Sequence, residues 1–362
     1  MKIPLSYRPI DAAALNEAVG RVAETDHLTL VHLFEMELAK VLARPVEVVS
    51  TNSGTSAIHL ALLALGVGPR DTVIAPTFTY IGSVAPIQYI GAKPVFIDCE
   101  ADTWGMDPEL LQQCLASMAE KKQIPKAVIV VDCYGMPAKW HEINNICRQY
   151  GVPTIEDAAA ALGGSYHGEP CGTLADVGVF SFNSNKTITT FGGGALITRC
   201  AKLAERARFL SAFARDPMPY YHYSEVGFNY RMGPLNAAYG ISQLPLIPQK
   251  VRERRLQFEA YRAALKREAV EFLNEPIGSF SSRWLTTVTF NNPYKVSDIQ
   301  FIAKQREIEI RPVWHPMHKQ VVFANEARWL NGFAEQFFEG GVCLPGTAEV
   351  ETVAALLAGY KL

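Results

Sequence analysis

The chain has 362 residues, 49% of them hydrophobic, and a formal net charge of -2 at pH 7. This composition suits one large domain with a smaller second one and excludes a disordered chain, while the near-neutral charge leaves no basic face for nucleic acid. The N-terminal residues lack the pattern of a signal peptide and no apolar run could span a bilayer, so we expect a cytoplasmic protein without a membrane partner.

Short β-rich runs alternate with helical patterns through the first two thirds of the chain. Helices are predicted at 56–65, 108–121 and 137–150. Several of the strands are continuously apolar, which indicates strands covered on both faces and hence a mostly parallel sheet between helices. The predicted strands are 72–76, 94–99, 127–135, 153–157, 177–182 and 193–198.

The composition changes near residue 245. A long charged helix is predicted over 247–269, and shorter β and α segments follow it to residue 362. We therefore predict a large domain over residues 1–244, which includes the N-terminal segment, and a linking helix with a small C-terminal α/β domain over 245–362.

No metal site is predicted. The seven cysteines stand singly without a CxxC pair, as reduced thiols do. His315 and His318 form the one close pair of histidines, but they lack the neighbouring carboxylates or cysteines of a metal site.

Ligands of open parallel sheets bind outside the carboxyl ends of the strands, and four suggestive groups lie at such places. The sequence SGTS (53–56) opens a predicted helix, where free N–H groups can bind phosphate, although an ordinary N-cap is the preferred interpretation if the motif stands alone. Asp157 ends a strand and either holds a ring N–H or caps the next helix. Tyr80 offers a ring to a planar cofactor or is an ordinary core or surface aromatic.

Lys186 is the fourth group, in a small polar loop between a strand and a glycine-rich turn. A single lysine in a loop is usually a solvated surface charge. Pyridoxal phosphate requires four groups: hydrogen-bond donors for its phosphate, a stacking ring, a carboxylate for the pyridine nitrogen and an amine. The combination therefore predicts a site for pyridoxal 5'-phosphate with Lys186 as the imine-forming lysine.

With these motifs the chain resembles the DegT/DnrJ/EryC1/StrS family of fold-type-I sugar aminotransferases. The resemblance runs through nearly the whole chain, from FEMELAKVL (34–42) and NSGTSAIHLALLALGVGPRDTVIAPTFTY (52–80) to GFNYRMGPLNAAYG (227–240). It implies a mostly parallel seven-stranded sheet between helices, a smaller C-terminal α/β domain, and pyridoxal phosphate as cofactor. It also implies L-glutamate and a nucleotide-linked keto-sugar as substrates, used in turn by a ping-pong mechanism, and a homodimer with shared active sites.

The resemblance assigns roles to particular residues. Lys186 and Asp157 are implied to be catalytic, with Asp157 as partner of the pyridinium nitrogen. Tyr80 is the implied stacking ring, and Asn229 is expected to reach the phosphate in the neighbouring subunit. The implied phosphate ligands are Gly54, Thr55 and Ser181, and Arg231 is a candidate for the carboxylate of the amino donor.

One residue departs from the family's pattern. Three residues after the aspartate the family usually has Gln, Glu or His, and this chain has Ala160. A side chain that often lies over the cofactor ring, or near the sugar, is therefore missing.

Three segments, 281–287, 311–318 and 340–346, look most like the enzymes that aminate C4 of UDP-2-acetamido-4-keto-sugars on the bacillosamine-type route. GDP-perosamine synthases share parts of this pattern, and a 3-keto-sugar aminotransferase is a further alternative. A non-catalytic regulatory protein that binds the cofactor is the alternative from another class, whereas 3-dehydratases of keto-sugars have histidine in place of the lysine. Trp284 and Trp314 are either core residues of the small domain or nucleotide contacts, and the candidates for substrate contacts are Arg311, Trp314, His315 and His318.

Overall fold

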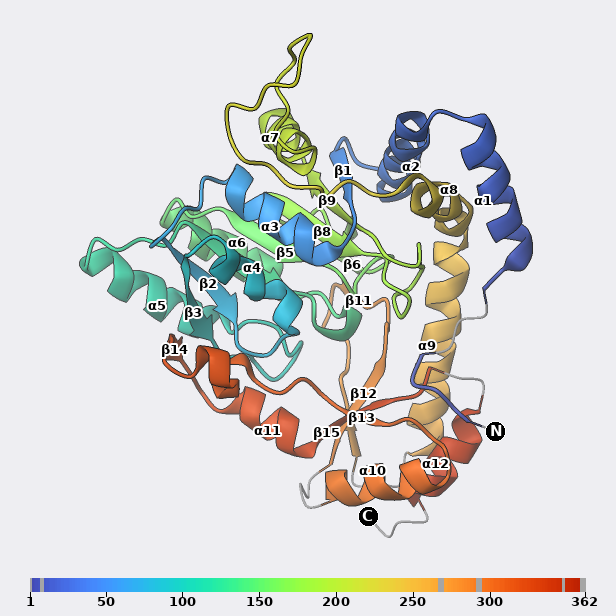
Figure 1. Ribbon diagram of the computed structural model, residues 1–362. Coiled ribbons are helices and arrows are strands. Elements are labelled where there is room, and N and C mark those ends of the chain that lie inside the picture. Colours follow the sequence, from blue (N-terminus) through green and yellow to red (C-terminus); the bar gives the residue numbers. More distant parts are fainter. Residues whose placement is uncertain (1, 7–9, 266–269, 291–294, 347–348, 359–362) are drawn as a thin grey trace.

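The computed structural model describes residues 2–6, 10–265, 270–290, 295–346 and 349–358. A large sheet with its helices occupies one end of the molecule, and a smaller sheet with its own helices occupies the other (Figure 1). The last residues of the predicted long helix, 266–269, lie outside the described residues.

The large sheet has eight strands in the described part of the chain, in the order β1-β9-β8-β5-β4-β2-β3-β14. Seven of them come from residues 47–198, and of these β9 runs antiparallel to both neighbours while the others share one direction. The predicted mostly parallel sheet of seven strands is thereby confirmed, and β14 adds an eighth strand beside β3. The strands are β1 (Glu47–Thr51), β2 (Thr72–Pro76), β3 (Lys93–Ile97), β4 (Ala127–Val131), β5 (Thr154–Asp157), β8 (Val177–Ser181), β9 (Gly194–Thr198) and β14 (Ala327–Trp329).

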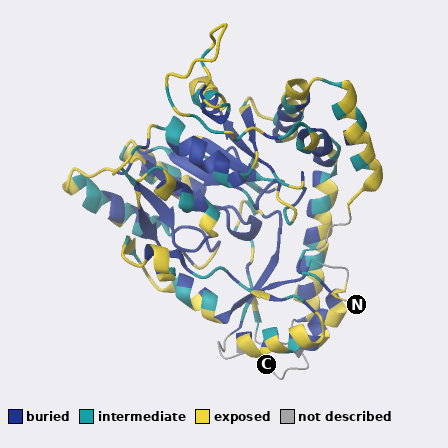
Figure 2. Ribbon diagram, in the orientation of Figure 1, coloured by how far each residue is buried: buried dark blue, intermediate teal, exposed yellow. Residues whose placement is uncertain are grey.

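Different helices cover the two faces of this sheet. Because side chains of a strand alternate between faces, Val73 of β2 joins the core beneath α3 (Gly54–Ala64), α4 (Ala85–Tyr89) and α7 (Ala201–Ser211), while Ile74 joins the core beneath α5 (Pro108–Glu120) and α6 (Trp140–Gln149). The central strands are buried on both faces (Figure 2). Three further helices pack beside the sheet: α1 (Ala12–Glu24), α2 (His27–Leu42) and α8 (Pro234–Gln243).

Two predicted elements are longer than the structure has them. The strand predicted over 127–135 ends at Val131, because Tyr134 (φ 53°) and Gly135 (φ 93°) take left-handed backbone angles in a short 3₁₀ turn. The helix predicted over 137–150 begins at Trp140, because the Ala138 N–H donates to the Asp132 carboxylate at 3.0 Å.

The long helix α9 (Ile247–Ala264) leads to the smaller sheet, whose order is β10-β12-β15-β13 (Figure 1). One face of this sheet packs with α9, α10 (Lys295–Gln305) and α12 (Val350–Ala358) in a separate core. The other face, with α11 (Phe333–Gly340), shares a core with residues of the large sheet. The strands are β10 (Val270–Phe272), β12 (Thr286–Phe290), β13 (Arg311–Pro312) and β15 (Gly341–Leu344).

Short elements complete the described chain. A three-stranded ribbon joins β6 (Ser165–Tyr166), β7 (Glu169–Pro170) and β11 (Ser279–Phe280). The 3₁₀ helices are Ile81–Ser83, Cys133–Gly135, Leu244–Leu246, Met317–Lys319 and Val321–Phe323. No helix in the described ranges combines the length and apolar character that crossing a membrane requires.

Two segments cross the predicted boundary at residue 244. Ile3 forms a β-bridge with Ile308 and lies in the core of the smaller sheet, whereas β14 belongs to the larger one. The division into 1–244 and 245–362 stays a prediction, and these two segments tie the parts together.

Candidate active site

A cavity of about 620 Å³ lies where the large sheet meets the small one. Residues just past the carboxyl ends of β2, β4, β5 and β8 line it, as is typical of open parallel sheets, and the loop before β12 closes the other side. The cavity brings together eight of the predicted site residues: Gly54, Thr55, Tyr80, Asp157, Ser181, Lys186, Arg311 and Trp314.

The first turn of α3 forms one end of the cavity. Ser53 caps this helix, because its Oγ accepts the Ser56 N–H at 3.0 Å and its carbonyl accepts the Ala57 N–H at 3.1 Å. The N–H groups of Gly54 and Thr55 have no carbonyl partner within the helix, as is usual in a first turn, and both residues line the cavity. Their N–H groups and the positive end of the helix dipole suit a phosphate.

Glycines bring the strands close to this turn. A Cβ on Gly54 would lie 3.1 Å from Ser181 Cβ, and a Cβ on Gly194 would lie 2.4 Å from the Gly54 nitrogen. A Cβ on Gly82 would lie 2.9 Å from Thr55 Oγ1. The small residues therefore place the Ser181 end of β8 directly beside the first turn of α3.

Asp157 ends β5 in the middle of the cavity wall. The Ser83 hydroxyl donates to its Oδ2 at 2.6 Å, and the Ala159 N–H donates to its Oδ1 at 3.0 Å. Burial raises the pKa of the Asp157 carboxyl, while these two hydrogen bonds and the charge of Lys186 oppose that rise. The hydrogen bonds orient the carboxylate, and its remaining lone pairs can accept an N–H from a ligand.

Lys186 lies in the loop between β8 and β9. Burial lowers the pKa of its amine to about 8, although the negative charge of Asp157 opposes the shift. The amine nitrogen lies 4.0 Å from the centroid of the Trp284 ring. A pKa this close to neutrality allows one amine both to accept and to release a proton.

Tyr80 and Ala160 complete the surroundings of the cavity. Tyr80 stands at its edge with 64% of the residue exposed. Ala160 is buried in the same core as Tyr134 and Trp284, whose rings are nearly parallel with centroids 6.2 Å apart. This part of the wall is therefore aromatic, where the family's usual side chain would be polar.

Four predicted residues do not line the cavity of this chain. Asn229 and Arg231 are exposed, and the Asn229 carbonyl accepts from Asn52 Nδ2 at 3.2 Å. His315 Nδ1 lies 2.9 Å from Gln320 Nε2. His318 is buried, with Nδ1 2.7 Å from Thr77 Oγ1 and Nε2 3.1 Å from Glu335 Oε1. These protein contacts explain both histidines without a substrate.

A pair of buried acids lies behind Asp157. Glu156 accepts the N–H groups of Gly172 and Leu174, and Asp132 Oδ1 accepts the Trp140 indole N–H at 2.9 Å. Asp132 Oδ2 is buried without a hydrogen-bond donor. Glu156 can supply that donor if its carboxyl group stays protonated. Burial and the neighbouring charge of Asp132 raise the pKa of Glu156 well above its ordinary value, so we assign the shared proton to Glu156.

Ser83 and the acid pair are not among the site residues predicted from the sequence. Ser83 stands three residues past Tyr80, in the 3₁₀ helix of the segment that follows β2, so its hydroxyl was a detectable signal. Its partner Asp157 is 74 residues away, and the sequence gives no sign of that contact. Glu156 faces Asp132 for the same non-local reason, because β4 and β5 pair in parallel.

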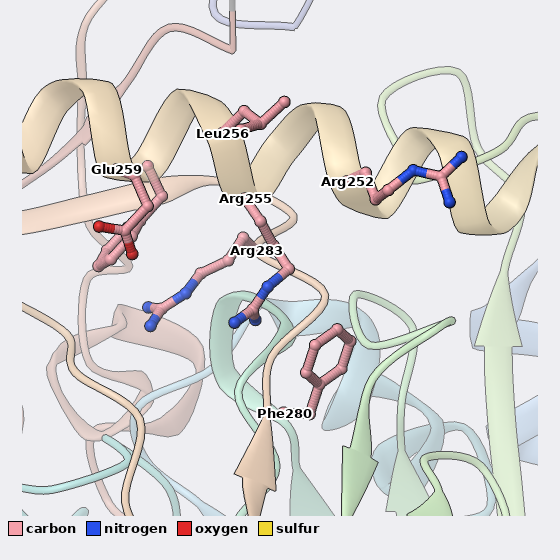
Figure 3. A pocket seen from close by; sticks show the side chains of 7 residues that line it. Arg252, Arg255, Leu256, Glu259, Phe280 and Arg283 are labelled. Atoms are coloured by element: carbon pink, nitrogen blue, oxygen red, sulfur yellow. The ribbon is translucent and has the colours of Figure 1, made fainter.

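A second hollow, of about 330 Å³, lies beside α9 (Figure 3). Arg255 donates to Glu275 and to the Ser281 carbonyl, and Arg283 donates to the Leu273 carbonyl. Both guanidinium groups also lie over phenylalanine rings, Arg255 over Phe280 and Arg283 over Phe258, at 4.1 and 3.7 Å. These arginines stabilise the protein, and none of the predicted site residues reaches this hollow.

Fold and site together define a pyridoxal-phosphate-dependent aminotransferase. The chain belongs to the DegT/DnrJ/EryC1/StrS aminotransferase family, which it matches over residues 10–355. This family places it among the sugar aminotransferases.

The relatives cover most of the chain. It is 42% identical over 321 residues to a Bacillus subtilis (strain 168) protein named "Putative pyridoxal phosphate-dependent aminotransferase EpsN", covering 87% of this chain and 82% of that one. It is 33% identical to the GDP-perosamine synthase of Caulobacter vibrioides, covering 92% of each. The aminotransferase TlmJ of Streptoalloteichus hindustanus has a similar structure, with a TM-score of 0.88 and 28% identity over 99% of this chain and 100% of that one.

The residues of the cavity fit this cofactor. The first turn of α3 lies at one end for the phosphate, Asp157 can accept a ring N–H, and Lys186 supplies a primary amine. Gly54, Gly82 and Gly194 lack a Cβ, so the backbone can approach closely at this end of the cavity, which suits a phosphate.

Proposed function

We propose that this protein transfers the amino group of L-glutamate to the C4 ketone of a nucleotide-linked 4-keto-6-deoxy sugar, UDP-2-acetamido-4-keto-2,6-dideoxyhexose, by a ping-pong mechanism. The observation that carries the proposal is the meeting of the Lys186 amine, the Asp157 carboxylate and the first turn of α3 in one cavity. Amino transfer needs these three groups together: a proton carrier, a partner for the ring nitrogen and an anchor for the phosphate.

When bound, pyridoxal phosphate supplies an electron sink that carries the amino group from donor to acceptor. Asp157 holds the ring nitrogen in its protonated form, and the hydrogen bonds from Ser83 and Ala159 fix the direction of its carboxylate. Gly54 and Thr55 hold the phosphate through their N–H groups, with Ser181 beside them. Tyr80, which lines the cavity, would supply an aromatic ring to pack against the cofactor.

Lys186 moves the proton. With the cofactor bound, the free and neutral Lys186 amine would take the proton from Cα of L-glutamate and would return it before 2-oxoglutarate leaves. With the sugar the order reverses, and Lys186 delivers a proton to C4 of the sugar. A pKa of about 8 makes the neutral and charged forms of this amine comparably accessible near neutrality.

The small domain supplies the side of the cavity where the sugar nucleotide binds. Arg311 is an exposed cation on the cavity wall and suits the diphosphate, although it must exchange its ion pair with Glu309 for that contact. Trp314 adds an apolar face for the sugar or the base. The similarity to a GDP-perosamine synthase makes a GDP-linked 4-keto-6-deoxymannose the alternative acceptor.

We further propose a homodimer with shared sites. The segment between α7 and α8 extends away from the sheet and is largely exposed (Figures 1 and 2), and it carries the exposed side chains of Phe213, Tyr221 and Val226. Asn229 and Arg231 lie near the end of this segment, are exposed and do not line their own cavity. In a dimer, Asn229 reaches the phosphate and Arg231 the donor carboxylate of the neighbouring subunit.

The test is product analysis with defined acceptors. The cofactor-loaded protein receives L-glutamate with the UDP-linked 2-acetamido-4-keto sugar, with GDP-4-keto-6-deoxymannose or with a nucleotide-linked 3-keto sugar, and mass spectrometry detects the amino sugar. Lys186→Ala and Lys186→Arg are expected to yield none. A product from the GDP-linked sugar alone would replace the proposed acceptor, whereas a cofactor-binding protein that aminates none of these sugars would be a regulatory binder.

A further inference from the structure

Trp284 contacts the catalytic loop at two neighbouring residues. The face of its indole lies 4.0 Å from Lys186 Nζ, and its indole N–H donates to the Asn185 carbonyl at 2.6 Å. Trp284 is 5% exposed and comes from the loop before β12, in the C-terminal part of the chain. One side chain of the small domain therefore touches both the amine and the backbone that carries it.

The support of Trp284 is rigid. Ser282 N–H donates to the Gly135 carbonyl at 3.0 Å, and Ser282 Oγ donates to the Ala160 carbonyl at 2.9 Å. The indole is nearly parallel to Tyr134, at an interplanar angle of 12°. These contacts hold the indole in place, so it can serve as a fixed partner for the flexible side chain of Lys186.

Few groups around the Lys186 amine can stabilise its charged form. Asp132, Asp157 and Arg311 are the charged groups of the cavity wall in the described chain, and of these Asp157 acts on the pKa of Lys186. Burial disfavours the ammonium form, and the face of an indole attracts it. The indole and Asp157 thus compensate together for part of the desolvation of Lys186.

We propose that Trp284 is a positioning residue whose indole face holds the Lys186 ammonium while the amine is protonated and not joined to the cofactor. This inference rests on the role of Lys186 in the proposed function. Each half-reaction frees the amine and later needs it back, and a free lysine side chain has many conformations. The indole gives the freed amine one defined location beside Asp157. The hydrogen bond from the indole N–H to the Asn185 carbonyl holds the Lys186 loop against the same indole.

The test measures the pKa of the Lys186 amine in the full-length, cofactor-free chain. Competitive acetylation with acetic anhydride across a pH series, read by peptide mass spectrometry, gives the value for this one lysine. Trp284→Leu removes the aromatic face and the N–H of the indole. This variant is expected to lower the pKa of Lys186 by about half a unit to one and a half units. Trp284→Phe keeps a weaker face and is expected to give a smaller fall.

Trp314→Leu is the matched control. Trp314 stacks on Tyr134 in the same wall, with ring centroids 4.0 Å apart, but Lys186 lies over the ring of Trp284. We expect no change in the pKa of Lys186 in this variant. An unchanged or higher pKa in Trp284→Leu, or an equal fall in Trp314→Leu, would overturn the inference.

If Trp284→Leu does not fold, a fluorinated tryptophan at position 284 replaces it. Fluorine withdraws electron density from the face while nearly preserving the ring's shape, so the pKa of Lys186 is again expected to fall. A merely structural tryptophan would leave it unchanged. Acetylation reports on the amine whether or not sugars are aminated, so this result and the product analysis succeed or fail separately.

Discussion

Ser83→Ala tests the electrostatics of Asp157. Ser83 donates the shorter of the two hydrogen bonds to this carboxylate, 2.6 Å against 3.0 Å from Ala159. A hydrogen bond to a charged group contributes about 1.5–3 kcal/mol, and one pKa unit corresponds to about 1.4 kcal/mol. Because the lost bond favoured the ionised form, the pKa of Asp157, already raised by burial, is expected to rise by about one to two units further.

The consequence appears in cofactor binding. Asp157 must be ionised to accept the N–H of the ring nitrogen, so affinity for pyridoxal phosphate falls as the pH drops through the pKa of Asp157. In Ser83→Ala that fall is expected at a pH about one unit higher or more, measured by titrating the full-length chain with cofactor between about pH 5 and pH 9. Thr79→Val is the matched control, because Thr79 Oγ1 lies 2.8 Å from Ser83 Oγ and reaches Asp157 through that hydroxyl alone. A profile in Ser83→Ala that matches the wild type, or an equal shift in Thr79→Val, would refute the reasoning.

Asp132→Asn is expected to stabilise the fold at neutral pH by about 1–3 kcal/mol, because its amide would donate to Glu156 while Oδ1 keeps the Trp140 indole N–H. Because the pKa of Glu156 is raised in the folded protein, the wild type loses stability as the pH rises. The unfolding temperature of the variant should therefore exceed that of the wild type by more at pH 8 than at pH 5. A larger difference at pH 5 would contradict the shared proton. Shared sites can be tested with the inactive variants Lys186→Ala and Asn229→Ala, unfolded and refolded together in equal amounts. Half of the resulting dimers are mixed, and each mixed dimer has one intact site of two. The mixture is therefore expected to regain about one quarter of wild-type turnover. No recovery in a confirmed mixed dimer would place Asn229 in the site of its own subunit or outside any site.

The sequence predicted the parts of the site that local patterns encode. Lys186, Asp157 and the first turn of α3 each follow a strand, and a parallel sheet brings such ends to one edge. Six of the strands were predicted to within a few residues for the same reason, because a continuous apolar run is a local signal.

The remainder depends on contacts between distant residues. β14 has three residues and forms only because its backbone pairs with β3, some 230 positions earlier in the chain. Trp284 is nearly a hundred residues from Lys186, and its place over the amine follows from how the two parts of the chain pack. His318 shows the opposite case: a histidine suggestive in the sequence is buried between Thr77 and Glu335.

The most direct test of amino transfer is the absorbance of the cofactor-loaded protein as the substrates are added in turn. L-Glutamate should bleach the band of the bound cofactor, and UDP-2-acetamido-4-keto-2,6-dideoxyglucose should restore it, because the two half-reactions are separate. Bleaching that this sugar does not reverse would contradict the proposed acceptor, and a band that glutamate leaves unchanged would contradict glutamate as the amino donor.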